Sequence, residues 1–304
     1  MTQRYSAGRR NLIGIALAGC LASLIASCTS SSTHAASPST AKAAAKPVQI
    51  FPGPAGLIGA GPPQANGTMW LLSRSGGAAD VSPLDLADAK MGGSVPVTSA
   101  ADALTELSTA TVVLGTATTT TGSVELLNGT SGTVSATIPV SSPVKAVAAG
   151  SDGVTVYALE ETASTEAVAV IDTTTSKVTA TIPVSTGTVS LVGSVDGSTV
   201  YGIQSNGLVS QYTIAGGQPT ARFPIGHSGV AAAIAPSGNT LYVLKSNGLV
   251  FNIAVVDLAT ERVVRALPAP ANAVGVVISP AGNTLYGLVG TPTLGNVQAF
   301  ALSS

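Results

Sequence analysis

The sequence predicts an all-β ring of repeated four-stranded sheets, and three observations lead to that fold class. The first is an apolar residue followed by proline, which recurs six times at nearly even spacing. Successive prolines are 44, 43, 44, 41 and 44 residues apart. The six dipeptides are Phe51-Pro52, Val95-Pro96, Ile138-Pro139, Ile182-Pro183, Phe223-Pro224 and Leu267-Pro268. A period of about 40–50 residues is typical of radial or stacked repeats.

A second marker repeats in phase with the prolines. It is an aromatic residue, once a valine, that precedes the proline by 26 residues in four repeats and by 23 in a fifth. The marker positions are Trp70, Val113, Tyr157, Tyr201, Tyr242 and Tyr286. No periodic proline follows the last marker, Tyr286. At the other end, Pro52 follows a strand-like run with no room before it for the other strands of a repeat. We therefore expect the N-terminal strand to complete the last repeat and close the ring.

The third observation is that each repeat contains four predicted strands. In the clearest repeat they cover residues 145–149, 154–159, 167–171 and 177–182. Apolar residues alternate with threonine in the last of them, the period of a strand with one buried face. Proline near its end is typical of an outer edge strand, where a missing N–H costs no ladder hydrogen bond. The sequence thus predicts a six-bladed β-propeller of four-stranded antiparallel blades, the last one closed by the N-terminal strand.

Several segments carry a resemblance to a known repeat. They are SPAGNTLY at residues 279–286, PSGNTLYV at 236–243 and VIDTTTSKV at 170–178. These segments resemble the YVTN-type propeller family of bacterial and archaeal surface proteins, over about residues 48–304. The asparagine of the family signature is replaced by Glu160, Gln204, Lys245 and Val289. Many relatives have seven blades, so their active-site assignments are not carried over.

Composition and charge exclude some classes of protein. Charged residues make up only 9% of the chain, against about 25% in ordinary domains. The formal net charge is −1, and no basic run is present. Nucleic acid is therefore not an expected partner. One period throughout residues 48–304 indicates one domain.

The N-terminus has the pattern of an export signal. Arg9 and Arg10 precede an apolar stretch over 12–27, followed by Cys28. The segment Ile25-Ala26-Ser27-Cys28 resembles the bacterial lipobox, in which cleavage precedes a cysteine that receives a diacylglyceryl thioether. We expect residues 1–27 to be a lipoprotein signal peptide with lipidation at Cys28. Cleavage before Cys20 and an uncleaved membrane anchor are the alternatives.

Residues 28–47 are rich in serine, threonine and alanine and are expected to form a disordered tether. The expected location is the extracytoplasmic face of the cell membrane, with the membrane as one partner through the lipid. An envelope protein or glycan of unknown identity is the other expected partner.

Catalytic and metal-binding patterns are sparse. The chain has two histidines, and His34 lies in the tether, so a His-rich zinc site is not expected. Glu160, Glu161 and Glu166 cluster in one stretch, which we interpret as a solvated loop. We assign no catalytic residue, no metal ligand and no cofactor.

A binding site is expected where the blades converge at one end of the central channel. The loops that lead into the first strands carry Asp102, Lys145, His227 and Asn272. Glu160 and Lys245 reach the same end from the second strands. Loops that converge on a rigid scaffold are common binding sites. The alternative is that these polar groups only solvate a water-filled mouth.

Two functions from different classes remain open. The first is a membrane-anchored propeller that acts as a binding or scaffolding module. The second is a lactonase-like or lyase-like enzyme at the channel mouth, which would need a tuned acid–base group and usually a metal. The scarcity of histidine and carboxylate at the mouth favours the first.

Overall fold

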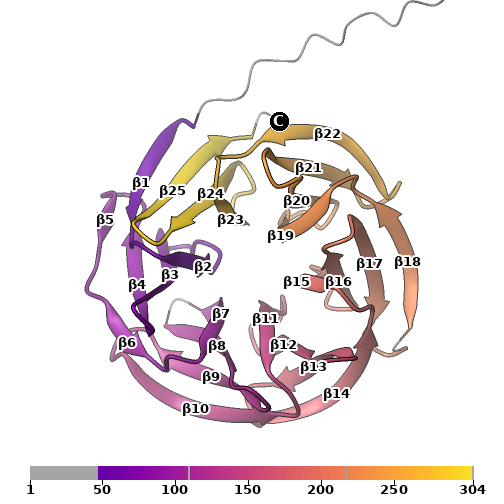
Figure 1. The fold of residues 1–304 in the computed structure, drawn as a ribbon, viewed down its shortest axis with the longest axis horizontal. Coiled ribbons are helices and arrows are strands. Elements are labelled where there is room, and N and C mark those ends of the chain that lie inside the picture. Colours follow the sequence, from indigo (N-terminus) through magenta and orange to yellow (C-terminus); the bar gives the residue numbers. More distant parts are fainter. Residues whose placement is uncertain (1–46, 109, 217, 303–304) are drawn as a thin grey trace, which may run out of the picture. The chain divides into compact units, whose positions relative to one another are not determined.

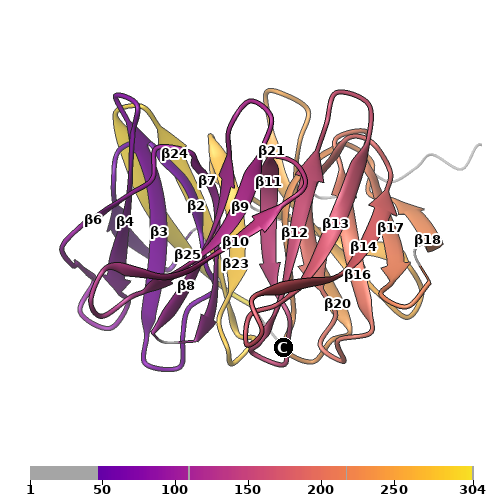
Figure 2. The ribbon, with the colours of Figure 1, turned by 90° about the horizontal axis from the view of Figure 1, so that it is seen from below.

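Six β-sheets surround a central axis (Figure 1). The structure is a computed structural model and describes residues 47–302, apart from 109 and 217. Each sheet is antiparallel, and in five of the six sheets the strands follow the chain outward from the axis. The strands run between the two faces of the ring (Figure 2). The predicted fold class, a six-bladed propeller, is confirmed.

Blades 2 to 5 are built alike, each with four strands in chain order. Blade 2 has β7 (Ala101–Ser108), β8 (Thr111–Ala117), β9 (Gly122–Asn128) and β10 (Thr133–Val140). Blade 3 has β11 (Val144–Ala149), β12 (Thr155–Glu161), β13 (Glu166–Asp172) and β14 (Lys177–Val184). Blade 4 has β15 (Thr188–Gly193), β16 (Thr199–Gln204), β17 (Leu208–Thr213) and β18 (Pro219–Pro224). Blade 5 has β19 (Ser228–Ile234), β20 (Thr240–Ser246), β21 (Phe251–Asp257) and β22 (Arg262–Pro268).

Blade 1 differs because its outer strand is broken. Its inner strands are β2 (Leu57–Ala60), β3 (Thr68–Ser75) and β4 (Ala78–Asp85), and the outer strand is split into β5 (Lys90–Met91) and β6 (Val95–Val97). Both pieces pair with β4. Pro83, in the middle of β4, has no N–H to offer an outer neighbour. Gly92 passes over it so closely that an added Cβ would lie 2.6 Å from Pro83 Cγ. The proline thus explains the break.

The N-terminal strand closes the ring as predicted. Blade 6 consists of β23 (Ala273–Ile278), β24 (Thr284–Thr291), β25 (Leu294–Ala301) and, outermost, β1 (Gln49–Gly53). In Figure 1 the indigo β1 lies against the yellow β25. The antiparallel register runs from Gln49 opposite Ala299 to Gly53 opposite Gly295. Residues from the two ends of the chain therefore share one sheet.

The periodic prolines and marker residues have distinct places in the blade. All six prolines lie in the outermost strand, where no further strand needs their N–H. All six marker residues lie in the second strand and are buried. The prolines therefore mark the outermost strand of each blade, and the marker residues mark its buried second strand.

The core consists of six apolar layers, one between each pair of neighbouring blades. Tyr157, for example, packs in the layer between blades 3 and 4, with Leu191 and Val200 of the next blade. The layer that closes the ring contains Phe51 and Tyr286 of blade 6. The centroids of these two rings are 6.3 Å apart. Both faces of every sheet are thus covered by a neighbour.

The export signal, Cys20, Cys28 and the tether up to residue 46 lie outside the described residues. Within residues 47–302, no helix has the length and apolar character needed to cross a membrane.

The closing strand gives the first prediction. Phe51 is 3% exposed in the closing layer, whereas Ile50 beside it is 59% exposed. Replacing Phe51 by Ala should lower the free energy of unfolding by about 3 kcal/mol, because it leaves a cavity in the layer. Ile50→Ala is the matched control and should change it by less than about 0.5 kcal/mol. Equal chemical-denaturation midpoints for the two variants would contradict closure by β1.

Candidate functional site

All six first strands begin at the same end of the central channel, which we call the mouth. The second strands end there, because each pairs antiparallel with the first strand of its blade. The described chain enters at the other end. Gln49 pairs with Ala299 near the end of β25, whereas β25 starts at the mouth, next to Thr291.

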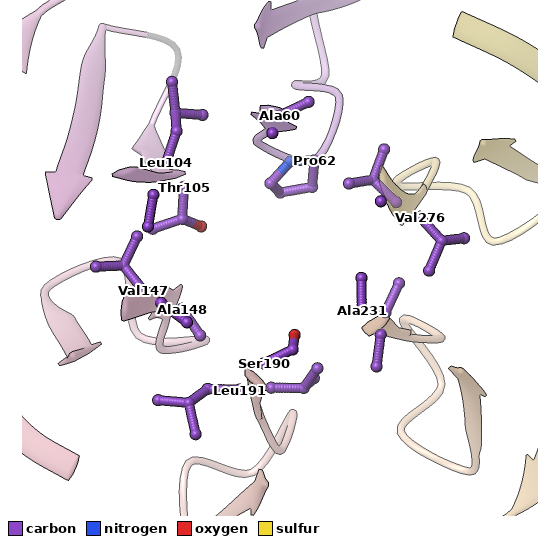
Figure 3. Close-up of a pocket in the computed structure, with 18 of the residues that line it drawn as sticks. Ala60, Pro62, Leu104, Thr105, Val147, Ala148, Ser190, Leu191, Ala231 and Val276 are labelled. Atoms are coloured by element: carbon purple, nitrogen blue, oxygen red, sulfur yellow. The ribbon is translucent and has the colours of Figure 1, made fainter. Parts of the chain in front are cut away.

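The channel holds a cavity of about 340 Å³ that all six blades line (Figure 3). Its walls are mostly alanine, valine, isoleucine, leucine and glycine. The polar residues that line it are Asp102, Thr105, Lys145 and Ser190. Figure 3 shows Thr105 and Ser190 among apolar neighbours such as Val147 and Val276. The channel is therefore an apolar tube with its charged groups at one end.

The charged groups at the mouth form ion pairs, and one of these pairs spans two blades. Arg74 Nη2, at the end of β3, lies 2.8 Å from Asp102 Oδ1, at the start of β7. The same nitrogen donates to the carbonyls of Ser99 at 3.2 Å and Ala101 at 2.5 Å. Both charged side chains are about one-third exposed. This pair joins blades 1 and 2.

A second group of charges lies in blade 3 and is bonded to the backbone at the start of blade 4. Lys145 Nζ, near the start of β11, donates to Glu161 Oε1 at 3.0 Å and lies 3.7 Å from Glu166 Oε1. Glu166 is buried and accepts the N–H of Gly187 at 2.9 Å and the N–H of Thr188 at 2.8 Å. We call the five residues Arg74, Asp102, Lys145, Glu161 and Glu166 the charged arc. It covers the blade 1 to blade 3 side of the mouth.

A side pocket of about 300 Å³ opens between blades 2 and 3. It is lined by Asp102, Ala117, Pro143, Val144, Lys145 and Glu161. Asp102 and Lys145 therefore border both this pocket and the channel. Of the predicted site residues, these are the two that the structure brings to one place.

The other predicted site residues lie apart. Glu160 is buried, and its Oε1 accepts the N–H of Ser142 at 2.9 Å. Lys245 is buried as well, donates to the carbonyl of Ile225 at 2.5 Å, and has its pKa lowered by that burial. His227 and Asn272 are exposed, in the loops before β19 and β23. Binding by any of these residues stays a prediction.

The prediction of a solvated loop is wrong for Glu160 and Glu166. Strands β12 and β13 extend into that stretch and leave only residues 162–165 as the connection. Alternation along β12 then turns Glu160 into an inter-blade layer and Glu161 to the mouth. Sequence reasoning also missed Arg74. Its position carried a signal, because Arg74 and Glu161 both precede their proline by 22 residues.

A buried acid lies near the far end of the channel. Glu106 in β7 is 3% exposed, and its Oε1 accepts the N–H of Trp70 from blade 1 at 2.8 Å. Its Oε2 has no hydrogen-bond partner among the described residues. Burial raises the pKa of Glu106 from 4.5 to about 8, and the N–H of Trp70 and the nearby side chain of Gln64 offset only part of that effect.

Across the described ranges, His, Cys, Asp and Glu side chains form no group of three that could hold a metal ion. The mouth offers ion pairs, hydrogen-bonding groups and an apolar channel, which are means of binding.

Glu106 gives the second prediction. Between pH 4.5 and about 8 the carboxyl group of Glu106 keeps its proton in the folded state and loses it in the unfolded state. The free energy of unfolding should therefore fall as pH rises through that window. Glu106→Gln keeps an oxygen for the N–H of Trp70 and removes the titration. Its stability advantage over the wild type should grow from pH 4.5 to 8 in urea titrations. Parallel pH curves for the two proteins would contradict the buried protonated acid.

The comparisons with known proteins identify the fold alone. No protein-family model and no curated protein sequence matches the chain. Among solved structures, hydrazine synthase from Kuenenia stuttgartiensis is similar with a TM-score of 0.59 and 16% identity. The match covers 82% of this chain and 96% of that one. At this identity the likeness shows a shared propeller and says nothing of chemistry. The resemblance to the YVTN-type family stays a prediction, and the chain is a six-bladed β-propeller without a family assignment.

Proposed function

We propose that this protein is an extracytoplasmic lipoprotein with a YVTN-type propeller, held at the cell membrane by lipid on Cys28. Its propeller acts as a binding or scaffolding module for an envelope protein or glycan. The observation that carries the binding role is the charged arc, because a chain with only 9% charged residues gathers five of them at one side of the mouth.

The arc has the properties of a recognition surface. Its side chains are held by ion pairs and by backbone hydrogen bonds on strand ends, so their geometry is fixed before a partner arrives. Asp102 and Glu161 are nevertheless 38% and 45% exposed and can still bond to a partner. Alternating charges of both signs favour a partner with complementary polar groups, such as a protein loop or a glycan.

The point at which the chain enters the propeller supports the anchored arrangement. The described chain begins at the end of the ring opposite the mouth. An anchor that precedes residue 47 would therefore leave the mouth uncovered. A tether of about 20 residues could extend for roughly 60 Å, at about 3.3 Å per residue. Both features leave the charged arc open to a large partner.

The anchoring is tested by Cys28→Ala. Lipid chains contribute about 0.8 kcal/mol for each buried CH₂, so loss of the acceptor sulfur should move the protein out of the membrane fraction. Cys20→Ala is the matched control and should leave the protein in that fraction, as quantitative immunoblots of fractionated cells will show. If Cys20→Ala releases the protein and Cys28→Ala does not, the lipid is on Cys20 and the proposed assignment is wrong.

The role of the arc is tested by the pair Asp102→Asn and Lys145→Gln in the Cys28→Ala background. The pair keeps the net charge and should cost at most about 1 kcal/mol of stability, because both groups are partly exposed. Binding to a purified envelope fraction should weaken roughly tenfold, or about 1.4 kcal/mol.

The control pair is Asp88→Asn and Lys90→Gln. These exposed residues lie after β4, at the end of the ring opposite the mouth, and their replacement changes the same charges. Cosedimentation of this variant should match the parent protein. If both pairs bind as the parent does, the partner contacts another surface and the proposal for the mouth is wrong.

A further inference from the structure

The central channel has the size and lining of a small-molecule site. Its cavity of about 340 Å³ lies within the range of about 300–1,000 Å³ for ligand pockets. Such pockets are mostly apolar with a few placed polar groups, and this one has four polar residues in an apolar wall. Water gains little in an apolar cavity, which instead binds apolar molecules. The wall therefore favours an apolar ligand over a filling of solvent.

Polarity changes along the channel axis. Asp102 and Lys145 stand at the mouth, where β7 and β11 begin. The hydroxyls of Thr105 and Ser190 follow further along their strands. The first strands of four blades then end on apolar or glycine residues at the far end of the channel, namely Ala149, Gly193, Ile234 and Ile278. A ligand with a polar head and an apolar tail would fit in one orientation only, with its head at the mouth.

The charges at the mouth select the type of head. Asp102 already has Arg74 as its partner, and Lys145 has Glu161 and Glu166. A charged head would have to displace one of these partners or accept a like charge beside it. An uncharged head can donate to Asp102 and accept from Lys145 while both ion pairs persist.

We propose that the channel binds a neutral amphiphile, with an unbranched apolar tail inside the tube and a hydroxyl or amide head between Asp102 and Lys145. This inference extends the proposed function from the rim to a small molecule within the channel. At about 30 Å³ for each water-sized atom, the cavity takes roughly eleven non-hydrogen atoms. 1-Decanol has that size and serves as the probe.

The experiment is isothermal titration calorimetry of the full-length protein with 1-hexanol, 1-octanol and 1-decanol. Each added CH₂ should tighten binding about fourfold, and the heat-capacity change should be negative. Decanoate and decylammonium have the same tail with a charged head and should bind at least tenfold more weakly than 1-decanol. Absence of binding by all three alcohols would overturn the proposal, and tighter binding of a charged analogue would overturn the neutral head.

Two variants locate the ligand. Ser190→Phe places a large side chain in the channel and should abolish binding of 1-decanol. Thr181→Phe makes a comparable change on the exposed outer strand β14 and should leave binding unchanged. Ala231→Leu, a smaller obstruction in the same wall, should weaken binding if Ser190→Phe fails to fold. Equal affinity in all folded variants would place the alcohols elsewhere. Envelope binding by the arc is measured separately, so that either proposal can fail alone.

Discussion

The structure depends on the fact that each blade has two apolar faces and can bury neither by itself. A sheet in an open row would leave one face of the first blade and one face of the last in water. Pairing of β1 with β25 removes both exposed faces at once, because it completes blade 6 and brings Phe51 into the layer shared with blade 1. Apolar burial at about 25 cal/mol per Å² then acts at all six interfaces.

In this arrangement, the side chains at the central axis are not needed to pack the core. The cores lie between blades, around the second and third strands, and the first strands need only small residues where they converge. Small apolar side chains on six strands leave an open tube, whereas larger ones would fill it. The cavity and the charged rim can therefore vary without loss of the ring, which is why so many functions share this architecture.

Features that recur in every blade could be predicted from the sequence, and features that occur once could not. Proline in the edge strand and a large apolar residue, aromatic in five blades and Val113 in blade 2, recur with the blade, so their spacing predicted the number of blades and the closing strand. The broken outer strand of blade 1 occurs once, opposite Pro83 in β4. The pairing of Arg74 with Asp102 depends on two side chains from different blades, whose separation no repeat encodes. The strands predicted from the sequence also ended too early. Glu160 and Glu161 therefore looked like one loop, although they lie on opposite faces of β12.

Two buried carboxylates show how the ring controls the position of charge. Glu166 places both oxygens on N–H groups of blade 4 and has Lys145 nearby, so its charge is compensated where blades 3 and 4 meet. Glu106 occupies a comparable inter-blade position at the other end of the channel, but only one of its oxygens accepts a hydrogen bond, and burial raises its pKa to about 8. Near neutral pH Glu106 therefore carries its proton. Glu106 thus stays neutral within its inter-blade layer without a counter-ion, whereas Glu166 has two N–H donors and Lys145 beside it.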